Sequence, residues 1–287
     1  MLRCYFQSRK AWSIILLCDY FGKDFSALKR KKLWLFDMDG TICNDGVVIP
    51  GTLELLKNIE QNHGKYVFIT NNSSKSLADY VNYVRTMYIN ADESNFFTSV
   101  QATILYMKKT YSNKRIYCQG TKSFIAELQQ SGIDVTTKAN DVDVVLVGFD
   151  TELTSEKLRN TCEILSRQKV DYIATNPDLV CPVSFGYIPD CGAICKMIAF
   201  ATGKEPKYMG KPEPIMIQEV CDKYGYEKTD TVVVGDRLYT DIAAGINAGV
   251  DSICVLTGEA TASEITSSVK KPTYTISSVK KIAELYK

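Results

Sequence analysis

The sequence is almost devoid of histidine. Its 287 residues include one, His63, in the short segment Asn62–Gly64. That segment is typical of a helix end, so we expect His63 to be a solvated capping residue. Ser-His-Asp and Cys-His catalysis both need a histidine held against the nucleophile, and histidine-rich zinc sites need several. The sequence therefore disfavours both classes of site.

Cysteine is present but is not arranged for metal binding. The ten cysteines are scattered, and no C-x-x-C motif occurs. Cys191 and Cys195 lie one helical turn apart and offer two metal ligands at most. In a chain of this size without a clear secretory signal, the pattern is typical of reduced thiols, so we expect a cytoplasmic protein.

Neither sign of charge is in excess, and long apolar runs are missing. Lys and Arg number 34 against 33 Asp and Glu, a formal charge of +1. No global basic field would collect nucleic acid, so we expect no nucleic-acid partner. The apolar run at 11–18 is shorter than the ~20 residues that cross a bilayer. We therefore expect no membrane association, and we treat residues 1–30 as an N-terminal extension without an assigned role.

Two common nucleotide-binding motifs are also absent. The chain has no G-x-x-x-x-G-K-[ST] segment, and no predicted strand leads into G-x-G-x-x-G. A P-loop NTPase and a Rossmann-type dehydrogenase would each carry one of these fingerprints. Neither class is predicted.

What the sequence does have, from Leu33 onward, is a regular alternation of short apolar runs and segments of helical periodicity. The apolar runs predict strands at 33–36, 66–69, 115–118, 142–147, 172–174, 231–234 and 252–256. The segments between them predict helices near 53–62, 77–87, 100–111, 121–130, 155–168, 193–201, 214–224 and 240–248. Continuously apolar strands are typical of a parallel sheet covered on both faces. The predicted fold class is α/β.

Three of the predicted strands end in polar clusters. Asp37 and Asp39 follow the first strand, the segment 70–73 (TNNS) follows the second, and Asp236 and Asp241 follow a later one. Open parallel sheets bind ligands beyond the carboxyl ends of their strands. We therefore expect the three clusters to form one site.

Four carboxylates in one crevice would repel one another unless a cation neutralised them. Oxygen ligands with open positions are what Mg²⁺ prefers, so the carboxylates predict a Mg²⁺ site. Thr70 and the turn at Asn71 and Asn72 can donate hydrogen bonds to a phosphate, and Lys211 supplies a positive charge for it. In such a site Asp37 can act as a nucleophile through an aspartyl-phosphate. Asp39 can serve as the general acid and base.

Taken together, these motifs resemble those of the haloacid dehalogenase (HAD) superfamily: DMDGT at 37–41, TNNS at 70–73, Lys211, and GDR with a later Asp at 235–241. The segments ATNPD (174–178), GKPEP (210–214) and GDRLYTDI (235–242) are similar to the NagD and p-nitrophenylphosphatase branch. The resemblance implies a Mg²⁺-dependent phosphatase with a Rossmann-like core. In it Asp37 is the nucleophile, Asp39 the acid and base, and Thr70 and Lys211 bind phosphate. Asp37, the Asp39 carbonyl and Asp236 hold the metal, with Asp241 as a supporting acid.

The long interval between Ser73 and Lys211 contains at least three predicted strands. We interpret it as an inserted α/β cap at 84–184 between core segments 31–83 and 185–287, with hinges near Tyr83 and Phe185. The resemblance implies the same kind of cap, and it allows a homodimer through the cap. Substrate specificity is expected in cap loops at 148–150 and 176–181, where the candidate residues are Asn176, Asp178 and Cys181. Cys181 stands where the vertebrate pyridoxal-phosphate phosphatases carry histidine, which argues against that specificity.

The expected substrates are small phosphate monoesters: a nucleotide, a sugar phosphate, phosphoglycolate or p-nitrophenyl phosphate. Two alternatives stay open. One is a phosphate-binding or partner-binding protein with little turnover, although such a protein would not need the second acid, Asp39. The other is a phosphotransferase, which would need a phosphorylated acceptor.

Overall fold

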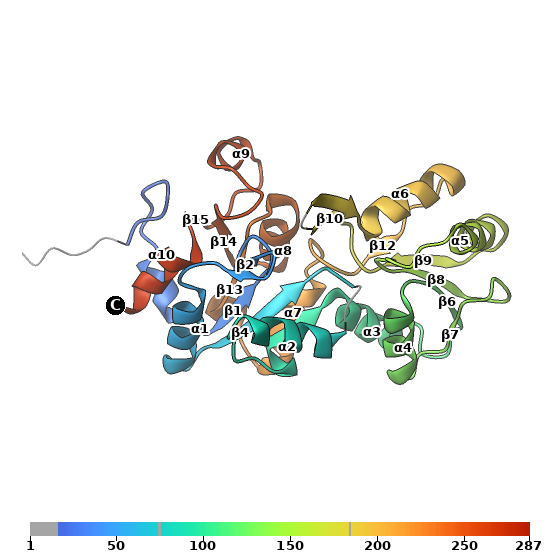
Figure 1. Cartoon of the computed structure of the whole chain (residues 1–287), viewed down its shortest axis with the longest axis horizontal. Helices are drawn as coiled ribbons and strands as arrows, with labels where there is room; N and C mark the ends of the chain where they lie inside the picture. Colours follow the sequence, from blue (N-terminus) through green and yellow to red (C-terminus); the bar gives the residue numbers. More distant parts are fainter. Residues whose placement is uncertain (1–16, 74–75, 184) are drawn as a thin grey trace, which may run out of the picture.

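Two parallel sheets organise the chain in the computed structural model, which describes residues 17–73, 76–183 and 185–287 (Figure 1). The larger sheet has the strand order β15-β14-β13-β1-β4-β5, and all neighbouring strands in it are parallel. The smaller sheet has the order β12-β9-β8-β6-β7 and is also parallel. Helices cover both sheets, which confirms the predicted α/β class.

The element boundaries follow the apolar runs of the sequence closely. The larger sheet consists of β1 (Leu33–Phe36), β4 (Lys65–Thr70), β5 (Phe96–Thr98), β13 (Thr231–Gly235), β14 (Asp251–Val255) and β15 (Tyr274–Ile276). The smaller sheet consists of β6 (Ile116–Gln119), β7 (Val135–Thr136), β8 (Val144–Val147), β9 (Asp171–Ala174) and β12 (Lys207–Tyr208). Antiparallel hairpins join β2 (Cys43–Asn44) to β3 (Val47–Val48) and β10 (Val180–Val183) to β11 (Gly186–Pro189).

The longer helices match the predicted segments to within a few residues. They are α1 (Thr52–Gln61), α2 (Leu77–Thr86), α3 (Ser99–Thr110), α4 (Lys122–Gln130), α5 (Ser155–Arg167), α6 (Cys191–Thr202) and α7 (Ile215–Tyr224). The predicted helix at 240–248 is a π-helical turn, η4 (Leu238–Ile242), followed by α8 (Ala243–Ala248). Two further short helices are α9 (Ala262–Ser267) and α10 (Val279–Ala283). Within the described residues, no helix has the length and apolar character needed to cross a membrane.

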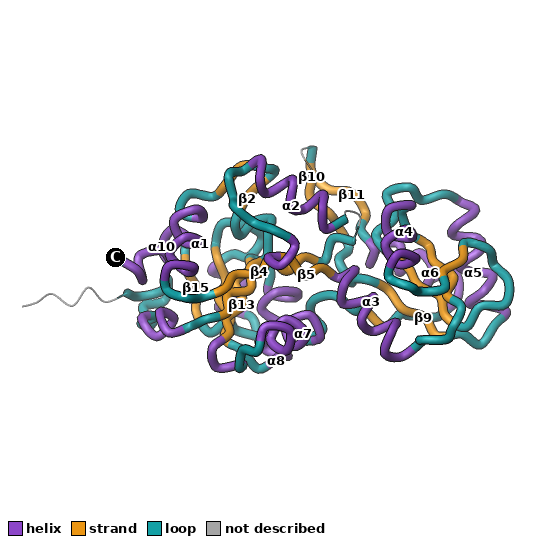
Figure 2. The backbone as a smooth tube through the Cα atoms, turned by 90° about the horizontal axis from the view of Figure 1, so that it is seen from below, coloured by secondary structure: helices purple, strands orange, loops and turns teal. Residues whose placement is uncertain are grey.

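Alternate residues of each strand pack on opposite faces of its sheet. In β1, Trp34 and Phe36 pack against side chains of α1, α2 and α10. Leu33 and Leu35 face the other way and pack against α7 and α8. Figure 2 shows these helices on the two sides of the larger sheet. Because both faces are buried, the strand is apolar at every position.

Helix α3 joins the two sheets into one body. Its Ala102 lies in the core beneath the larger sheet, whereas Val100, Ile104 and Met107 pack into the core of the smaller sheet. Figure 2 shows α3 between the two lobes of the molecule. The chain passes from the first lobe to the second where β5 ends at Thr98 and α3 begins at Ser99.

The strand pairings continue past residues 84 and 185, where the sequence predicts the boundaries of the cap. Strand β5 pairs with β4 and so extends the first unit to Thr98. Strand β12 pairs with β9 and so extends the second unit to Tyr208. The expected hinge residues Tyr83 and Phe185 lie within α2 and at the turn of the β10–β11 hairpin. Short edge strands show little periodicity in the sequence. Which sheet such a strand joins is therefore decided by its pairing with a neighbouring strand.

The described part of the N-terminal extension is an integral part of the first unit, whereas residues 1–16 lie outside the described residues. Phe25 and Leu28 are 0% and 1% exposed and join the main hydrophobic core. The backbone N–H of Tyr20 donates to the carbonyl of Thr275 at 2.7 Å, and Thr275 N–H donates to Oδ2 of Asp19 at 3.0 Å. The segment thus lies alongside strand β15 at the edge of the larger sheet.

Replacing Phe25 by alanine should lower the free energy of unfolding by about 3–5 kcal/mol, because a fully buried ring would leave a cavity. Chemical denaturation measures the change. Phe21→Ala is the matched control, since Phe21 is 53% exposed and its replacement should cost little. Equal stability of the two variants would show that the extension does not contribute to the core.

Candidate active site

Strands β13, β1 and β4 are neighbours in the larger sheet, so their carboxyl ends lie side by side. Asp37 follows β1, Thr70 ends β4, and Asp236 follows β13. The structure therefore brings the three predicted polar clusters together at one edge of the sheet. Asp241 joins them from the turn η4, where its side chain is fully buried.

Lys211 lies at the centre of this cluster. Its side chain is 2% exposed, and its Nζ lies 2.5 Å from Oδ1 of Asp37 and 2.6 Å from Oδ1 of Asp241. The ammonium also donates to the carbonyl of Ile69 at 3.0 Å. Burial acts to lower the pKa of Lys211, but Asp241 and Asp37 outweigh it and raise that pKa. Lys211 is thus a cation held firmly between two acids.

The carboxylate of Asp236 is held on one side and open on the other. Its Oδ2 accepts the backbone N–H of Glu259 at 2.7 Å, whereas its buried Oδ1 has no hydrogen-bond partner among the described residues. A Cβ on Gly40 or Gly258 would lie 2.4 or 2.0 Å from Oδ2, so both positions require glycine. Burial, together with the charge of Asp241, raises the pKa of Asp236 to about 6.

The carboxylates fit a divalent cation. Asp37, Asp236 and Asp241 each offer an oxygen, and these oxygens lie within 4.8 Å of one another. Burial raises the pKa of Asp37 as well, although Lys211 partly offsets the effect. Three acids beside one ammonium leave negative charge that a hard cation would neutralise. Of the predicted ligands, Asp37 and Asp236 belong to this group. The side chain of Asp39 does not, and the prediction assigned only its carbonyl to the metal.

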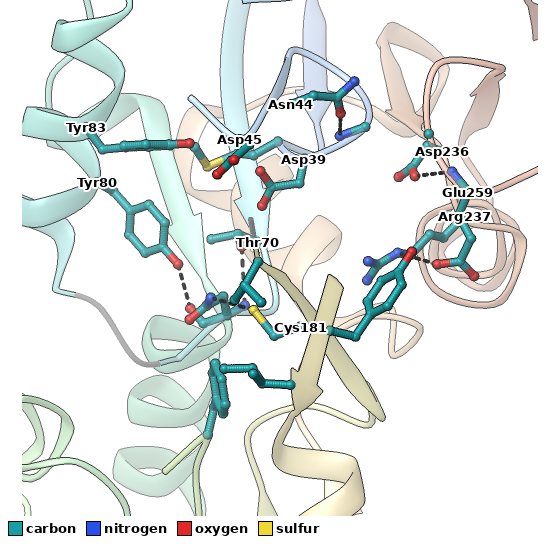
Figure 3. A pocket seen from close by; sticks show the side chains of 18 of the residues that line it. Asp39, Asn44, Asp45, Thr70, Tyr80, Tyr83, Cys181, Asp236, Arg237 and Glu259 are labelled. Carbon is teal, nitrogen blue, oxygen red and sulfur yellow. Dashed lines mark hydrogen bonds and ion pairs between the residues drawn. The ribbon is translucent and has the colours of Figure 1, made fainter. Parts of the chain in front are cut away.

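Asp39 instead lines the cavity that opens over the site. The cavity has a volume of about 600 Å³ and lies between the first unit and the β10–β11 hairpin. Figure 3 shows Asp39 between the tyrosines of α2 and Asp236. A smaller recess of about 40 Å³ continues from it and is lined by Asp37 and Lys211. An ester could thus place its phosphate in the recess and its alcohol part in the cavity.

The predicted phosphate-binding residues of β4 divide into two kinds. Thr70 and Asn72 line both the cavity and the recess. The hydroxyl of Thr70 accepts the backbone N–H of Asn72 at 3.2 Å and so shapes the turn. Asn71 lines the recess, but its side chain binds protein groups: its Oδ1 accepts the backbone N–H of Lys211 at 2.7 Å, and its Nδ2 donates to the carbonyl of Lys211 at 2.8 Å.

The three predicted specificity residues of the second unit also differ from one another. Cys181 on β10 lines both the cavity and the recess, and Asp178 lines the recess. Asn176 is fully buried and lines neither. Its amide donates to Asp178 and Asp190, each at 3.0 Å, so it holds other side chains in place.

Sequence reasoning missed several residues around the cavity. Arg237 bridges two acids: its Nη1 lies 3.3 Å from Oδ1 of Asp178, and its Nε lies 3.0 Å from Oε2 of Glu259. Glu259 follows β14, so the rule about strand ends could have found it. The aromatic side chains that line the cavity gave no such signal, because they come from a helix, a loop and a hairpin. They are Tyr80, Tyr83, Phe149 and Tyr187.

Comparison with known proteins agrees with this geometry. Residues 34–134 match the family described as haloacid dehalogenase-like hydrolase, and residues 208–282 match a second family described as HAD-hydrolase-like. The acid sugar phosphatase of Staphylococcus epidermidis (strain ATCC 12228) is 34% identical, over 91% of this chain and 100% of the relative.

Solved structures of the same fold resemble this chain at a similar level of sequence identity. The 4-nitrophenylphosphatase of Thermotoga maritima is 36% identical with a TM-score of 0.85, over 91% of this chain and 99% of that one. NagD from Escherichia coli K-12 is 32% identical with a TM-score of 0.80, over 87% and 97% of the two chains. The similarity extends through both units and the site between them, and the chain belongs to the haloacid dehalogenase-like hydrolases, in the branch of NagD and the p-nitrophenylphosphatases.

Proposed function

We propose that this chain is a Mg²⁺-dependent phosphatase that hydrolyses small phosphate monoesters through an aspartyl-phosphate at Asp37. The observation that carries the proposal is the recess in which Asp37 and the buried ammonium of Lys211 lie 2.5 Å apart, open to a cavity lined by a second acid, Asp39. A nucleophile, a cation for the phosphate and an acid for the leaving group are the components that such a reaction needs.

In the first step, a carboxylate oxygen of Asp37 attacks phosphorus, and the bond from phosphorus to the ester oxygen breaks. Asp39 gives its proton to that oxygen, and the alcohol leaves. Asp39 then takes a proton from water while the water oxygen attacks the phosphoryl group. The bond from phosphorus to Asp37 breaks, and inorganic phosphate leaves. Lys211 holds the negative phosphate oxygens throughout, and Thr70 can donate its hydroxyl to one of them.

Asp37, the Asp39 carbonyl and Asp236 would hold Mg²⁺ here, and the cation would neutralise negative charge on the phosphate and the acids. The buried Oδ1 of Asp236, which has no hydrogen-bond partner in the described part of the chain, supports this assignment. A cavity of about 600 Å³ suits a small molecule. Sugar phosphates and nitrophenyl phosphate, the substrates named for the relatives, are therefore the first candidates. The scattered cysteines, with no C-x-x-C motif among them, support a cytoplasmic location.

Phosphate release from p-nitrophenyl phosphate and a panel of natural monoesters tests the proposal. Turnover should require Mg²⁺, fall to background in EDTA, and return when Mg²⁺ is restored in excess. The panel should include a sugar phosphate, a nucleoside monophosphate and phosphoglycolate, and the ester with the highest kcat/KM would identify the substrate class. If folded protein released phosphate from no ester, the binding and phosphotransferase alternatives would replace the proposal. Activity that persists in EDTA would show that the reaction does not require Mg²⁺.

A further inference from the structure

A buried carboxylate of the second unit reaches into the catalytic edge of the first. Asp178 is 3% exposed and lies between β9 and β10. Its Oδ2 accepts Nδ2 of Asn71 at 2.6 Å and Nδ2 of Asn176 at 3.0 Å. Its Oδ1 accepts Nη1 of Arg237 at 3.3 Å. Asn71 and Arg237 belong to the first unit, so one side chain of the second unit binds two separate loops of the catalytic edge.

The partner Asn71 in turn fixes Lys211. The Asn71 amide pairs with both backbone groups of Lys211, at 2.7 and 2.8 Å. A Cβ on the preceding Gly210 would lie 2.5 Å from Oδ1 of Asn71, so the two segments are packed as closely as their atoms allow. The amide therefore holds the Lys211 backbone, together with the bond from the Gly210 N–H to the carbonyl of Thr175 at 2.7 Å, and the ammonium extends from that position.

Other contacts between the units surround this link. The hydroxyls of Ser73 and Thr175 lie 2.9 Å apart, and the backbone N–H of Phe149 donates to Ser73 at 2.9 Å. They come from the same β4 turn and the same edge of the smaller sheet. None of these contacts touches Lys211. Asp178 reaches Lys211 through the Asn71 side chain, and the hydroxyl of Ser99 on α3 donates to the backbone carbonyl of the same Asn71 at 2.7 Å.

We propose that Asp178 is a positioning residue that couples the docking of the second unit to the placement of Lys211 through Asn71. The inference rests on the proposed function, because it takes the recess at Lys211 as the phosphate site. Asp178 needs no contact with the phosphate. It orients the Asn71 amide, the amide holds the Lys211 backbone, and the ammonium then faces Asp37. The phosphate site is thus complete when the second unit is docked.

The charge of Asp178 explains why a carboxylate is needed. An ionised carboxylate is an acceptor only, and here it faces three donors. An asparagine at this position would turn an NH₂ group toward either the two amides or Arg237, and one side of the link would break. Asp178→Asn is therefore a test that changes volume very little.

Binding of inorganic phosphate in the presence of Mg²⁺, measured by calorimetry, separates positioning from electrostatics. Removing a negative charge beside the recess would by itself strengthen the binding of an anion. If Asp178 positions Lys211, the Asp178→Asn variant should instead bind phosphate about tenfold more weakly or worse, the range seen when outer-shell partners are removed. The kcat of the Asp178→Asn variant should fall together with its phosphate affinity. Phosphate binding that is unchanged or tighter would overturn the proposal.

Two further variants keep the result interpretable. Val145→Ala creates a cavity in the fully buried core of the second unit and should lower stability without changing phosphate affinity. Asn71→Ser breaks the same link from the first unit and serves if Asp178→Asn does not fold; unchanged affinity there would also refute the coupling. In the Asn71→Ser background, Asp178→Asn should cause no further loss of affinity, since its route to Lys211 is already cut. An additional loss would show a different route.

Failure of this inference is distinguishable from failure of the proposed function. A wild-type protein that hydrolyses esters, with Asp178→Asn binding phosphate normally, would retain the phosphatase and refute the coupling. A wild-type protein that binds no phosphate with Mg²⁺ would refute both.

Discussion

Replacing Asp37 by asparagine should reduce phosphate release by about 10⁴-fold or more, the scale expected when a covalent nucleophile is removed. The fold should survive. Burial raises the pKa of Asp37, so its ionised form is costly in the folded state, and a neutral amide of the same shape removes that cost. Lys211 keeps its second partner, Asp241, at 2.6 Å. We therefore expect a melting temperature equal to that of the wild type or higher.

Two measurements check this expectation. Steady-state release from p-nitrophenyl phosphate gives the loss of turnover. Acid quenching of the enzyme with labelled substrate should trap a phosphoprotein in the wild type and none in Asp37→Asn. Asp143→Asn is the control, because Asp143 lies in the second unit and pairs with the exposed Lys114 at 2.9 Å, away from the cavity. Retention of most of the turnover by Asp37→Asn would exclude Asp37 as the nucleophile.

Replacing Lys211 by methionine should damage both activity and stability. The substitution keeps the length of the side chain and removes its charge, which leaves Asp37, Asp236 and Asp241 without their buried cation. Breaking a buried ion pair from one side costs about 3–5 kcal/mol, because the remaining charge is left uncompensated. Loss of a preorganised cation at the phosphate should lower kcat/KM by about 10²–10³-fold.

Chemical denaturation and steady-state kinetics measure the two effects. Lys196→Met is the matched control: Lys196 pairs with Glu205 at 2.9 Å, but both side chains are more than half exposed. Such a surface pair contributes less than about 1 kcal/mol, and its removal should leave turnover unchanged. If Lys211→Met were as stable and as active as the control, the ammonium would be neither a phosphate ligand nor a structural counterion.

Mg²⁺ should also stabilise the Lys211→Met variant more than the wild type, since the variant carries the same acids with one positive charge fewer. A thermal-shift titration with Mg²⁺ tests this part of the argument without any turnover. A smaller increase in melting temperature in the variant than in the wild type would mean that these acids do not jointly bind Mg²⁺.

Much of the fold could be predicted because its signal is local. Continuous apolar runs marked β1, β4, β8 and β13, and helical periodicity marked α1 to α7, since both faces of a parallel sheet must be covered by apolar side chains. The short strands β5, β7, β12 and β15 were missed, because two or three residues carry no periodicity. Two of them, β5 and β12, carry the sheet pairings on to Thr98 and Tyr208, past residues 84 and 185 where the sequence predicts the boundaries.

The candidate site divides in the same way. The acids and the lysine could be named in advance, because residues at the carboxyl ends of neighbouring parallel strands must meet at one edge of the sheet. The Asp178–Asn71–Lys211 link and the bridge from Arg237 to Asp178 could not, because Asp178 belongs to the second unit and its place against the first depends on how the two units pack. Which side chains face the cavity was likewise decided by packing, as Asn176 and Cys181 show: five residues apart, one is fully buried and the other lines the cavity.

The sequence alone thus determined the α/β class, the covering helices and the chemistry available at the strand ends, since each depends on the order of residues within one element. Only the tertiary structure decided where the two units divide, which side chains line the cavity and how the second unit is attached to the catalytic edge. These depend on distances between elements that are remote in the chain, and such distances are set when the two cores pack.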